Sequence, residues 1–390
     1  MSYAREIISL FPPDSFPRRL YNGRRIAFYS GYYMTEEDIR KCENNCHIKH
    51  CVVEKYIQKY PDFTNKTFRI ISQLILNAPV YKKRQNDKDL VDDMLFCGLA
   101  YGFDPFEYLS YKLEDKNPKE RTAFVSDREL MLDVYRMNDR VDIQIYNDKA
   151  NTYLKFRPYY KRDAVIVSSK NDLNCFYEFV RKHPVFVKKK VNEAMGRSIE
   201  LIDLKSSDLT PENAFEMIIG EGKCLLEEKV IQSDAMSRLN QSSVNTVRVI
   251  TYYTKEGIIV PFCFAKIGRA GSFVDNGGAG GILSGIEQKT GQLNTDGFDE
   301  YSTRYSAHPD SGIVFKGYQL PEFEKAVSLA VELSKMTPTI KFIGWDFAHT
   351  DDGWVIIEGN GMSQLIGPQT VYERGVKSEV DAIKQVMELI

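Results

Sequence analysis

The residues best suited to chemistry lie in two short apolar runs, GWDFA at 344–348 and VIIEGN at 355–360. The Asp-Gly step in the turn between them favours a tight β-hairpin. Pairing the two runs would bring Asp346, Glu358 and Asn360 together, and the last two would share a face of the strand. Such oxygen ligands suit Mg²⁺, which takes one or two carboxylates and leaves its other positions to phosphates and water. A solvated surface hairpin is the alternative.

A lysine-rich strand end is a second candidate site. Lys188 follows an apolar strand expected at 185–187 and precedes a loop at 192–198. A lysine beneath such a loop can hold nucleotide phosphates as a fixed positive charge. Lys190 would share its face and could take the same role. The alternative is a lysine that protects an edge strand from aggregation.

Three further segments carry polar groups that could contact a nucleotide. Glu227 ends a strand expected at 224–227 and Glu228 follows it, and exposed backbone groups there could bind an adenine edge. Arg248 lies in a β-rich run and must face either a carboxylate of the fold or a bound phosphate. The glycine-rich loop at 275–281 lets backbone N–H groups approach an anion. No Lys-Ser or Lys-Thr pair follows this loop, so it is not a Walker A loop.

The elements that must position these residues change in kind near residue 146. Residues 1–145 are predicted to form a mainly helical region, with helices at 35–60, 66–78, 87–101 and 127–137. Beyond it, short strands alternate with helices, which indicates an α/β or α+β arrangement. Strands are expected at 165–167, 185–187, 199–204, 224–227, 247–253 and 258–266, and helices at 171–182, 211–219, 322–335 and 377–389.

Composition narrows the classes of protein. A chain of 390 residues has room for two or three domains, and its formal charge of −2 gives no reason to expect nucleic acid or an anionic membrane as partner. No apolar run approaches the roughly 20 residues of a membrane span. The N-terminus has no secretory-type segment, and seven cysteines are an odd number, so we expect a cytoplasmic protein. Nothing indicates its oligomeric state.

One cysteine-rich segment leaves its role open. Cys42, Cys46 and His50 are spaced at i, i+4 and i+8, so one helix face could offer three ligands to zinc. Their spacing matches no known zinc pattern. The alternative is that the cysteines pack as small apolar residues.

The joint order of these motifs over residues 146–375 resembles the ATP-grasp superfamily. The lysine strand, the loop, the Glu-Glu strand exit, Asn-Thr-x-Arg at 245–248, the glycine loop and the Asp…Glu-x-Asn hairpin follow one another as in that superfamily. The chain is most similar to the sugar-transfer-associated branch of teichuronopeptide-biosynthesis type. The resemblance implies an α+β ATP-grasp fold at 146–390, in which two α+β lobes grip the nucleotide and the lid lobe spans about 165–232. It also implies ATP and two Mg²⁺ ions, with Mn²⁺ as an alternative.

The resemblance also implies roles for individual residues. The cofactor-binding set would comprise two phosphate lysines, a lid-loop glycine and an adenine pocket, namely Lys149 and Lys188, Gly196, and Glu227, Glu228 and Val230. Asp346, Glu358 and Asn360 would be the metal ligands. Arg248 would face the γ-phosphate. Lys188-Lys189-Lys190 stands where a lysine-proline step is usual, which leaves the choice of lysine open. Arg269 and Arg304 are candidates for binding the substrate carboxylate, because arginine can bind a carboxylate bidentately.

The resemblance therefore implies an ATP-dependent carboxylate–amine ligase that acts through an acyl phosphate. Its substrates would be a small-molecule carboxylate and an amine or sugar, in surface polysaccharide or glycoconjugate assembly. One alternative is a phosphotransferase acting on a hydroxyl or carboxylate. Another is a non-catalytic nucleotide-binding module, which the complete set of metal ligands disfavours.

Overall fold

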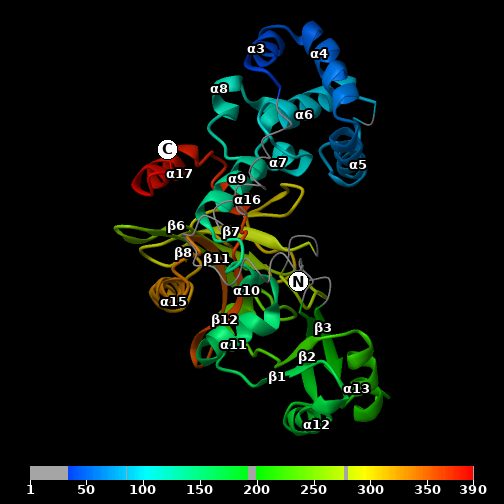
Figure 1. The fold of residues 1–390 in the computed structure, drawn as a ribbon, viewed down its shortest axis with the longest axis vertical. Coiled ribbons are helices and arrows are strands. Elements are labelled where there is room, and N and C mark those ends of the chain that lie inside the picture. The colour runs from blue at the N-terminus through cyan, green and yellow to red at the C-terminus, as the bar shows by residue number, and fades with distance from the viewer. Residues whose placement is uncertain (1–33, 85, 192–198, 276–279, 390) are drawn as a thin grey trace.

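The computed structural model describes residues 34–84, 86–191, 199–275 and 280–389. A helical region lies at one end, a large sheet in the middle and a small sheet at the other end (Figure 1). Gly196 and positions 276–279 of the glycine loop lie outside the described residues. No helix in the described part of the chain is both long and apolar enough to cross a membrane.

The N-terminal region is helical, as predicted. Its helices are α3 (Glu36–Asn44), α4 (Cys46–Lys59), α5 (Pro61–Asn77), α6 (Lys88–Ala100), α7 (Pro105–Ser110), α8 (Pro118–Arg121) and α9 (Asp127–Met137). The single helix expected at 35–60 is divided in two, because the backbone of Asn45 is extended. The boundary near residue 145 stays a prediction, since helices continue through α10 (Gln144–Asn147) and α11 (Lys149–Tyr160).

A buried charge network fixes the centre of the helical region. The carboxylate of Asp93 on α6 accepts hydrogen bonds from Arg121 (2.6 and 3.1 Å), from Lys49 (2.6 Å) and from the Tyr108 hydroxyl (2.8 Å). Burial alone would raise the pKa of Asp93, but Arg121 and Lys49 lower it. Asp93 therefore stays ionised and neutralises two cations inside the helical core.

Asp93→Ala should destabilise the protein by about 3–5 kcal/mol, because it leaves the Arg121 guanidinium buried without its carboxylate. Urea unfolding would show the loss as a lower transition midpoint. The matched control is Asp89→Ala, which removes an exposed acid from the same helix and should change stability by less than about 0.5 kcal/mol. Equal midpoints for the two variants would contradict this account.

A buried glutamine joins the helical region to the remainder of the chain. Gln369 lies in α16 (Ile366–Val371) and is 0% exposed. Its amide oxygen accepts from the Val125 backbone N–H (2.8 Å), and its amide nitrogen donates to the Val125 carbonyl (2.9 Å) and to the Tyr111 hydroxyl (2.8 Å). These contacts hold the helical region against the segment that follows the predicted metal ligands.

The large sheet is antiparallel. Its strand order is β10-β9-β7-β6-β5-β11-β12, with β8 paired to β7. The strands are β5 (Thr246–Thr254), β6 (Gly257–Ile267), β7 (Ile282–Glu287), β8 (Gln292–Leu293), β9 (Gly297–Phe298), β10 (Arg304–Tyr305), β11 (Phe342–Thr350) and β12 (Gly353–Asn360).

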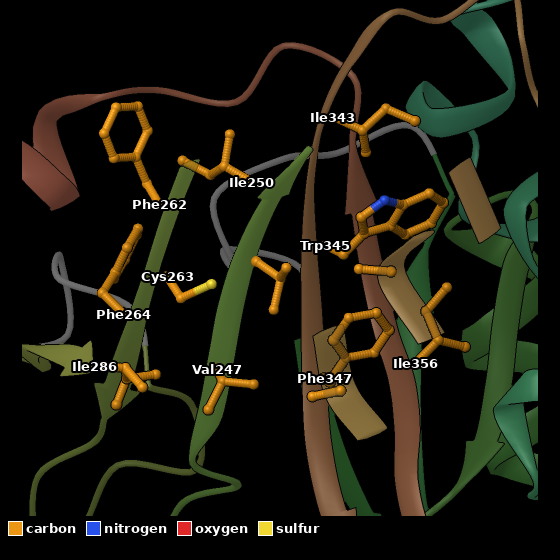
Figure 2. Close-up of a cluster of buried hydrophobic side chains, with 14 of the residues drawn as sticks. Val247, Ile250, Phe262, Cys263, Phe264, Ile286, Ile343, Trp345, Phe347 and Ile356 are labelled. Carbon is orange, nitrogen blue, oxygen red and sulfur yellow. The ribbon is translucent and has the colours of Figure 1, made fainter. Parts of the chain in front are cut away.

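The two faces of this sheet differ. On one face Val247, Cys263, Trp345, Phe347 and Ile356 build the main core (Figure 2). This core packs against α10, α11 and α15 (Phe323–Lys335). Gly359 allows the close approach, since a Cβ there would lie 2.8 Å from the Tyr146 ring. On the opposite face α16 covers β6, where a Cβ on Gly367 would meet the Phe264 ring at 2.5 Å.

The small sheet forms a separate lobe below the large one (Figure 1). Its order is β1-β4-β2-β3, from β1 (Ala164–Val167), β2 (Val185–Lys190), β3 (Ile199–Asp203) and β4 (Cys224–Glu228). Helices α12 (Leu173–Lys182) and α13 (Pro211–Gly220) cover its outer face. Two further helices are α14 (Asp234–Leu239), between the lobes in sequence, and α17 (Lys377–Val386) near the chain end.

Candidate active site

The β11–β12 hairpin pairs the two apolar runs of the sequence. Asp346 lies directly opposite Glu358, and Gly344 lies opposite Asn360. Phe347 pairs with Ile356, so Ile357 is the extra residue of a β-bulge. The bulge lets Ile356 stay in the core with Phe347 while Glu358 shares the other face with Asp346, which is how bulges re-aim side chains at functional sites.

The carboxylate of Asp346 is the centre of a buried charge cluster. Asp346 is 2% exposed and accepts two hydrogen bonds from Arg248, from Nε at 2.7 Å and from Nη2 at 2.5 Å. Lys266 on β6 adds a third contact at 3.3 Å. Of the two partners expected for Arg248, the structure therefore shows the carboxylate of the fold.

The opposite charges in this cluster keep one another ionised. Burial alone would raise the pKa of Asp346 and lower those of Arg248 and Lys266. Opposite charges reverse each shift: Arg248 and Lys266 lower the pKa of Asp346, Asp346 raises the pKa of Arg248, and Asp275 and then Asp346 raise the pKa of Lys266. Asp275 differs, because burial raises its pKa despite the Lys266 ammonium at 3.3 Å. The cluster thus holds two firmly charged cations beside one firmly charged acid.

Glu358 and Asn360 lie beside this cluster and are partly exposed. The Asn360 amide nitrogen lies 3.5 Å from the Asp346 carboxylate. Among the described residues, the Glu358 carboxylate makes no hydrogen bond or ion pair. Two carboxylates and one amide oxygen fit Mg²⁺, which takes few protein ligands and completes its shell with phosphates and water. Asp346 would have to exchange its contacts with Arg248 for contacts with the ion.

Three polar residues of this face were not predicted from the sequence. Lys266, Asp275 and Ser363 become neighbours of Asp346 or Arg248 only in the folded chain. The Ser363 hydroxyl is buried and has no hydrogen-bond partner among the described residues, and a Cβ on Gly344 would lie 2.2 Å from it. Lys266 could have been found, because a charge closing the apolar run at 258–266 needs a buried partner.

The strand β2 separates its lysines onto opposite faces of the small sheet. Lys188 is fully buried on the outer face, where its ammonium contacts Glu221 (2.7 Å) and Glu200 (3.0 Å). Lys190 contacts Glu221 on the same face (3.2 Å). Lys189 points the other way and donates to Glu227 (3.0 Å). Side chains alternate along a strand, so only Lys189 of the three faces the large sheet.

The inner face of the small sheet is tied to the large sheet through Arg162. Glu227 is 2% exposed, and its Oε2 accepts from Arg162 Nε (2.9 Å) and Nη2 (2.7 Å) as well as from Lys189. These cations outweigh burial and lower the pKa of Glu227. Arg162 also donates to the Ile356 carbonyl of β12 (2.8 Å). Glu227 is thus a charged group at the junction of the two lobes.

The other predicted nucleotide residues lie around this junction. Lys149 begins α11, and its backbone N–H donates to the carbonyl of Val191, the residue after β2 (3.1 Å). Glu228 points away from Glu227, toward the Asp163 backbone N–H (3.1 Å). Val230 is partly buried, and its neighbour Ile231 is 80% exposed. An exposed apolar side chain in the connection between the lobes could support a flat base.

The two candidate substrate arginines lie apart from the Asp346 cluster. Arg269 lies in the loop that follows β6 and donates to Asp310 (2.7 and 3.1 Å), and Gly280 lies against the Arg269 side chain. Arg304 is on β10, at the opposite edge of the sheet from β12, and contacts Asp296 (2.6 Å) and Glu373 (3.2 Å). The structure therefore places Arg269 near the glycine loop and leaves Arg304 outside the cluster.

Two cavities flank the hairpin at its two ends. One of about 560 Å³ lies at the turn, among Lys161, Glu322 and Asp351, away from the charge cluster. A second of about 170 Å³ lies beside Met362, which follows Asn360 by two residues, and is also lined by Tyr135 and Arg140. The smaller cavity adjoins the strand end that carries the predicted metal ligands.

The cysteine-rich helices show no metal site among the described side chains. Cys42 is buried at 1% exposure, whereas the His50 ring lies exposed beside Asp92 (2.6 Å) and Glu54 (3.3 Å). The side chain of Cys46 lies outside the described residues.

Comparison with known proteins places this arrangement in a family. The profile of the sugar-transfer associated ATP-grasp family matches residues 134–385. No curated protein matches the chain. Among solved structures, the ATP-grasp ligase PsnB is similar at a TM-score of 0.41 with 12% identity, over 69% of this chain and 70% of that one. D-alanyl-alanine synthetase A from Vibrio cholerae gives 0.38 with 13% identity, over 63% and 65%. Phosphoribosylamine–glycine ligase from Thermotoga maritima gives 0.41 with 14% identity, over 64% and 56%. It is the family profile that assigns the chain, which belongs to the sugar-transfer associated ATP-grasp family.

Proposed function

We propose that this protein is an ATP-dependent ligase that joins a carboxylate to an amine through an acyl phosphate. The observation that carries the proposal is the polar face of the large sheet, where Asp346, Glu358 and Asn360 lie beside Arg248 and Lys266. Two carboxylates flanked by fixed cations suit a bound metal–triphosphate, and the edge strand β12 of this sheet contacts Arg162, which shares Glu227 with Lys189.

The proposed reaction uses both the cations and the carboxylates of the site. A substrate carboxylate oxygen attacks the γ-phosphorus of ATP, and the bond to ADP breaks. The amine then attacks the acyl carbon, loses a proton and expels inorganic phosphate. Arg248, Lys266 and Lys189 would offset the negative charge of the transferring phosphoryl group. Mg²⁺ held by Asp346, Glu358 and Asn360 would neutralise phosphate oxygens.

The substrate class and setting extend the proposal. We place the phosphates between Lys149, Lys189 and the Asp346 cluster, and the adenine beside Val230 and Ile231. Arg269, next to the glycine loop, is the arginine best placed for the substrate carboxylate. The family's association with sugar transfer supports a cytoplasmic step that supplies a surface polysaccharide or glycoconjugate.

An assay of the full chain with ATP, Mg²⁺ and pooled sugar acids and amines tests the reaction type. We expect ADP to form together with a condensed product, and neither to form if the acids are omitted. ADP with a phosphorylated product would instead show a phosphotransferase. Mass spectrometry of the products separates the two outcomes, because condensation removes water whereas phosphorylation adds a phosphate.

A further inference from the structure

Glu227 is shared by two cations that are held in different ways. Every described hydrogen bond of its carboxylate ends on Oε2, from Arg162 Nε (2.9 Å), Arg162 Nη2 (2.7 Å) and Lys189 Nζ (3.0 Å). Arg162 and Glu227 are almost fully buried, at 4% and 3% side-chain exposure. Each cation therefore contributes to neutralising a carboxylate that water cannot solvate.

Arg162 is fixed from outside the small sheet. Helix α11 contains Pro158, and Lys161 follows it in the left-handed region, which turns the chain toward β1 and brings Arg162 to the junction. The guanidinium stacks 4.4 Å from the Tyr160 ring centre and donates Nη1 to the Tyr160 and Ile356 carbonyls (3.2 and 2.8 Å). Lys189 has a single ammonium on a flexible stem, so it can move where Arg162 cannot.

A nucleotide phosphate would compete with Glu227 for Lys189. If Lys189 were the only partner of Glu227, its departure would leave a buried carboxylate unpaired, which is strongly unfavourable. Arg162 keeps two hydrogen bonds on the same oxygen while Lys189 leaves. We propose that Arg162 is a positioning residue that retains Glu227 so that Lys189 is released to a nucleotide phosphate. This inference rests on the proposed role of Lys189 in the nucleotide site.

Removing the Arg162 guanidinium should hold Lys189 on Glu227. In Arg162→Gln, Lys189 becomes the remaining cation on Glu227 and must break that pair to bind phosphate. We expect the Kd for the ATP analogue AMPPNP with Mg²⁺ to rise at least about tenfold, measured by titration calorimetry on the full chain. Arg162→Lys keeps a charge at this position and should recover part of the affinity.

The double variant Arg162→Gln/Glu227→Gln separates positioning from mere structural support. It removes the carboxylate that traps Lys189 but keeps the backbone groups that could bind an adenine edge, so the affinity should return to within about threefold of the original protein. Simple damage to the junction would instead leave the double variant as weak as Arg162→Gln, or weaker. Arg84→Gln is the matched control, because Arg84 also forms ion pairs, with Asp87 and Glu114, but lies in the helical region, and it should leave the Kd unchanged.

The outcomes distinguish this inference from the proposed function. An unchanged Kd in Lys189→Ala would contradict the proposed role of that lysine. A raised Kd in Lys189→Ala together with an unchanged Kd in Arg162→Gln would overturn only the role of Arg162. The role of Arg162 would also be overturned if Arg162→Gln raised the Kd and adding Glu227→Gln did not restore it. The double variant must keep a native circular dichroism spectrum for this comparison.

Discussion

Glu358→Gln is expected to lower Mg²⁺-dependent ATP consumption by at least about a hundredfold while leaving the protein folded. Glu358 is partly exposed, and within the described part of the chain its carboxylate holds no other residue in place. Removing its charge should therefore weaken metal binding without creating an unpaired buried partner. Steady-state ADP release, compared with the thermal unfolding midpoint, checks both parts of the expectation.

The matched comparison for this variant is Asp346→Asn. Asp346 neutralises Arg248 and Lys266 inside the protein, so its replacement should abolish turnover and also cost about 3–5 kcal/mol of stability. Loss of activity in Asp346→Asn alone would be ambiguous, whereas loss in a stable Glu358→Gln protein would not. Near-normal ATP consumption by Glu358→Gln would remove this residue from the metal site.

The second large effect is expected for Lys189. Lys189→Ala should weaken binding of AMPPNP by about tenfold to a hundredfold, because one charge-assisted phosphate contact of about 1.5–3 kcal/mol is lost. Arg162 still pairs Glu227 in this variant, so the fold should survive. Titration calorimetry measures the change in Kd.

Lys188→Ala provides the control for Lys189→Ala, since Lys188 precedes it on the same strand. Lys188 faces Glu200 and Glu221 on the outer side of the small sheet, so its removal should leave the Kd within about threefold. The reverse pattern, with weak binding in Lys188→Ala alone, would show that the nucleotide meets the other face.

The hairpin could be predicted from the sequence because its signals are local. The Asp-Gly step and the period-two spacing of Glu358 and Asn360 fix the turn and the shared face, and the observed register pairs Asp346 with Glu358. The bulge at Ile357 could not be predicted, because it depends on which side chains the core accepts. The sequence also does not show that Asp346 is buried between two cations.

Which of the three lysines at 188–190 faces the large sheet could not be predicted from the sequence. Three consecutive lysines alternate between faces, but only packing decides which face is inner. Phe186 enters the core beneath α12 and α13, and this places Lys188 on the outer side and Lys189 on the inner side. Arg162 gave no signal, because its partners Glu227 and Ile356 are 65 and 194 residues away in sequence.

The fate of oxygen-18 tests the proposed reaction most directly. Pooled sugar acids labelled with oxygen-18 in the carboxylate would be incubated with the protein, ATP, Mg²⁺ and amines. An acyl phosphate transfers one carboxylate oxygen to phosphorus, so we predict inorganic phosphate carrying one oxygen-18 atom, released together with ADP and a condensed product. Condensed product accompanied by unlabelled phosphate, or by AMP in place of ADP, would contradict the acyl-phosphate ligase.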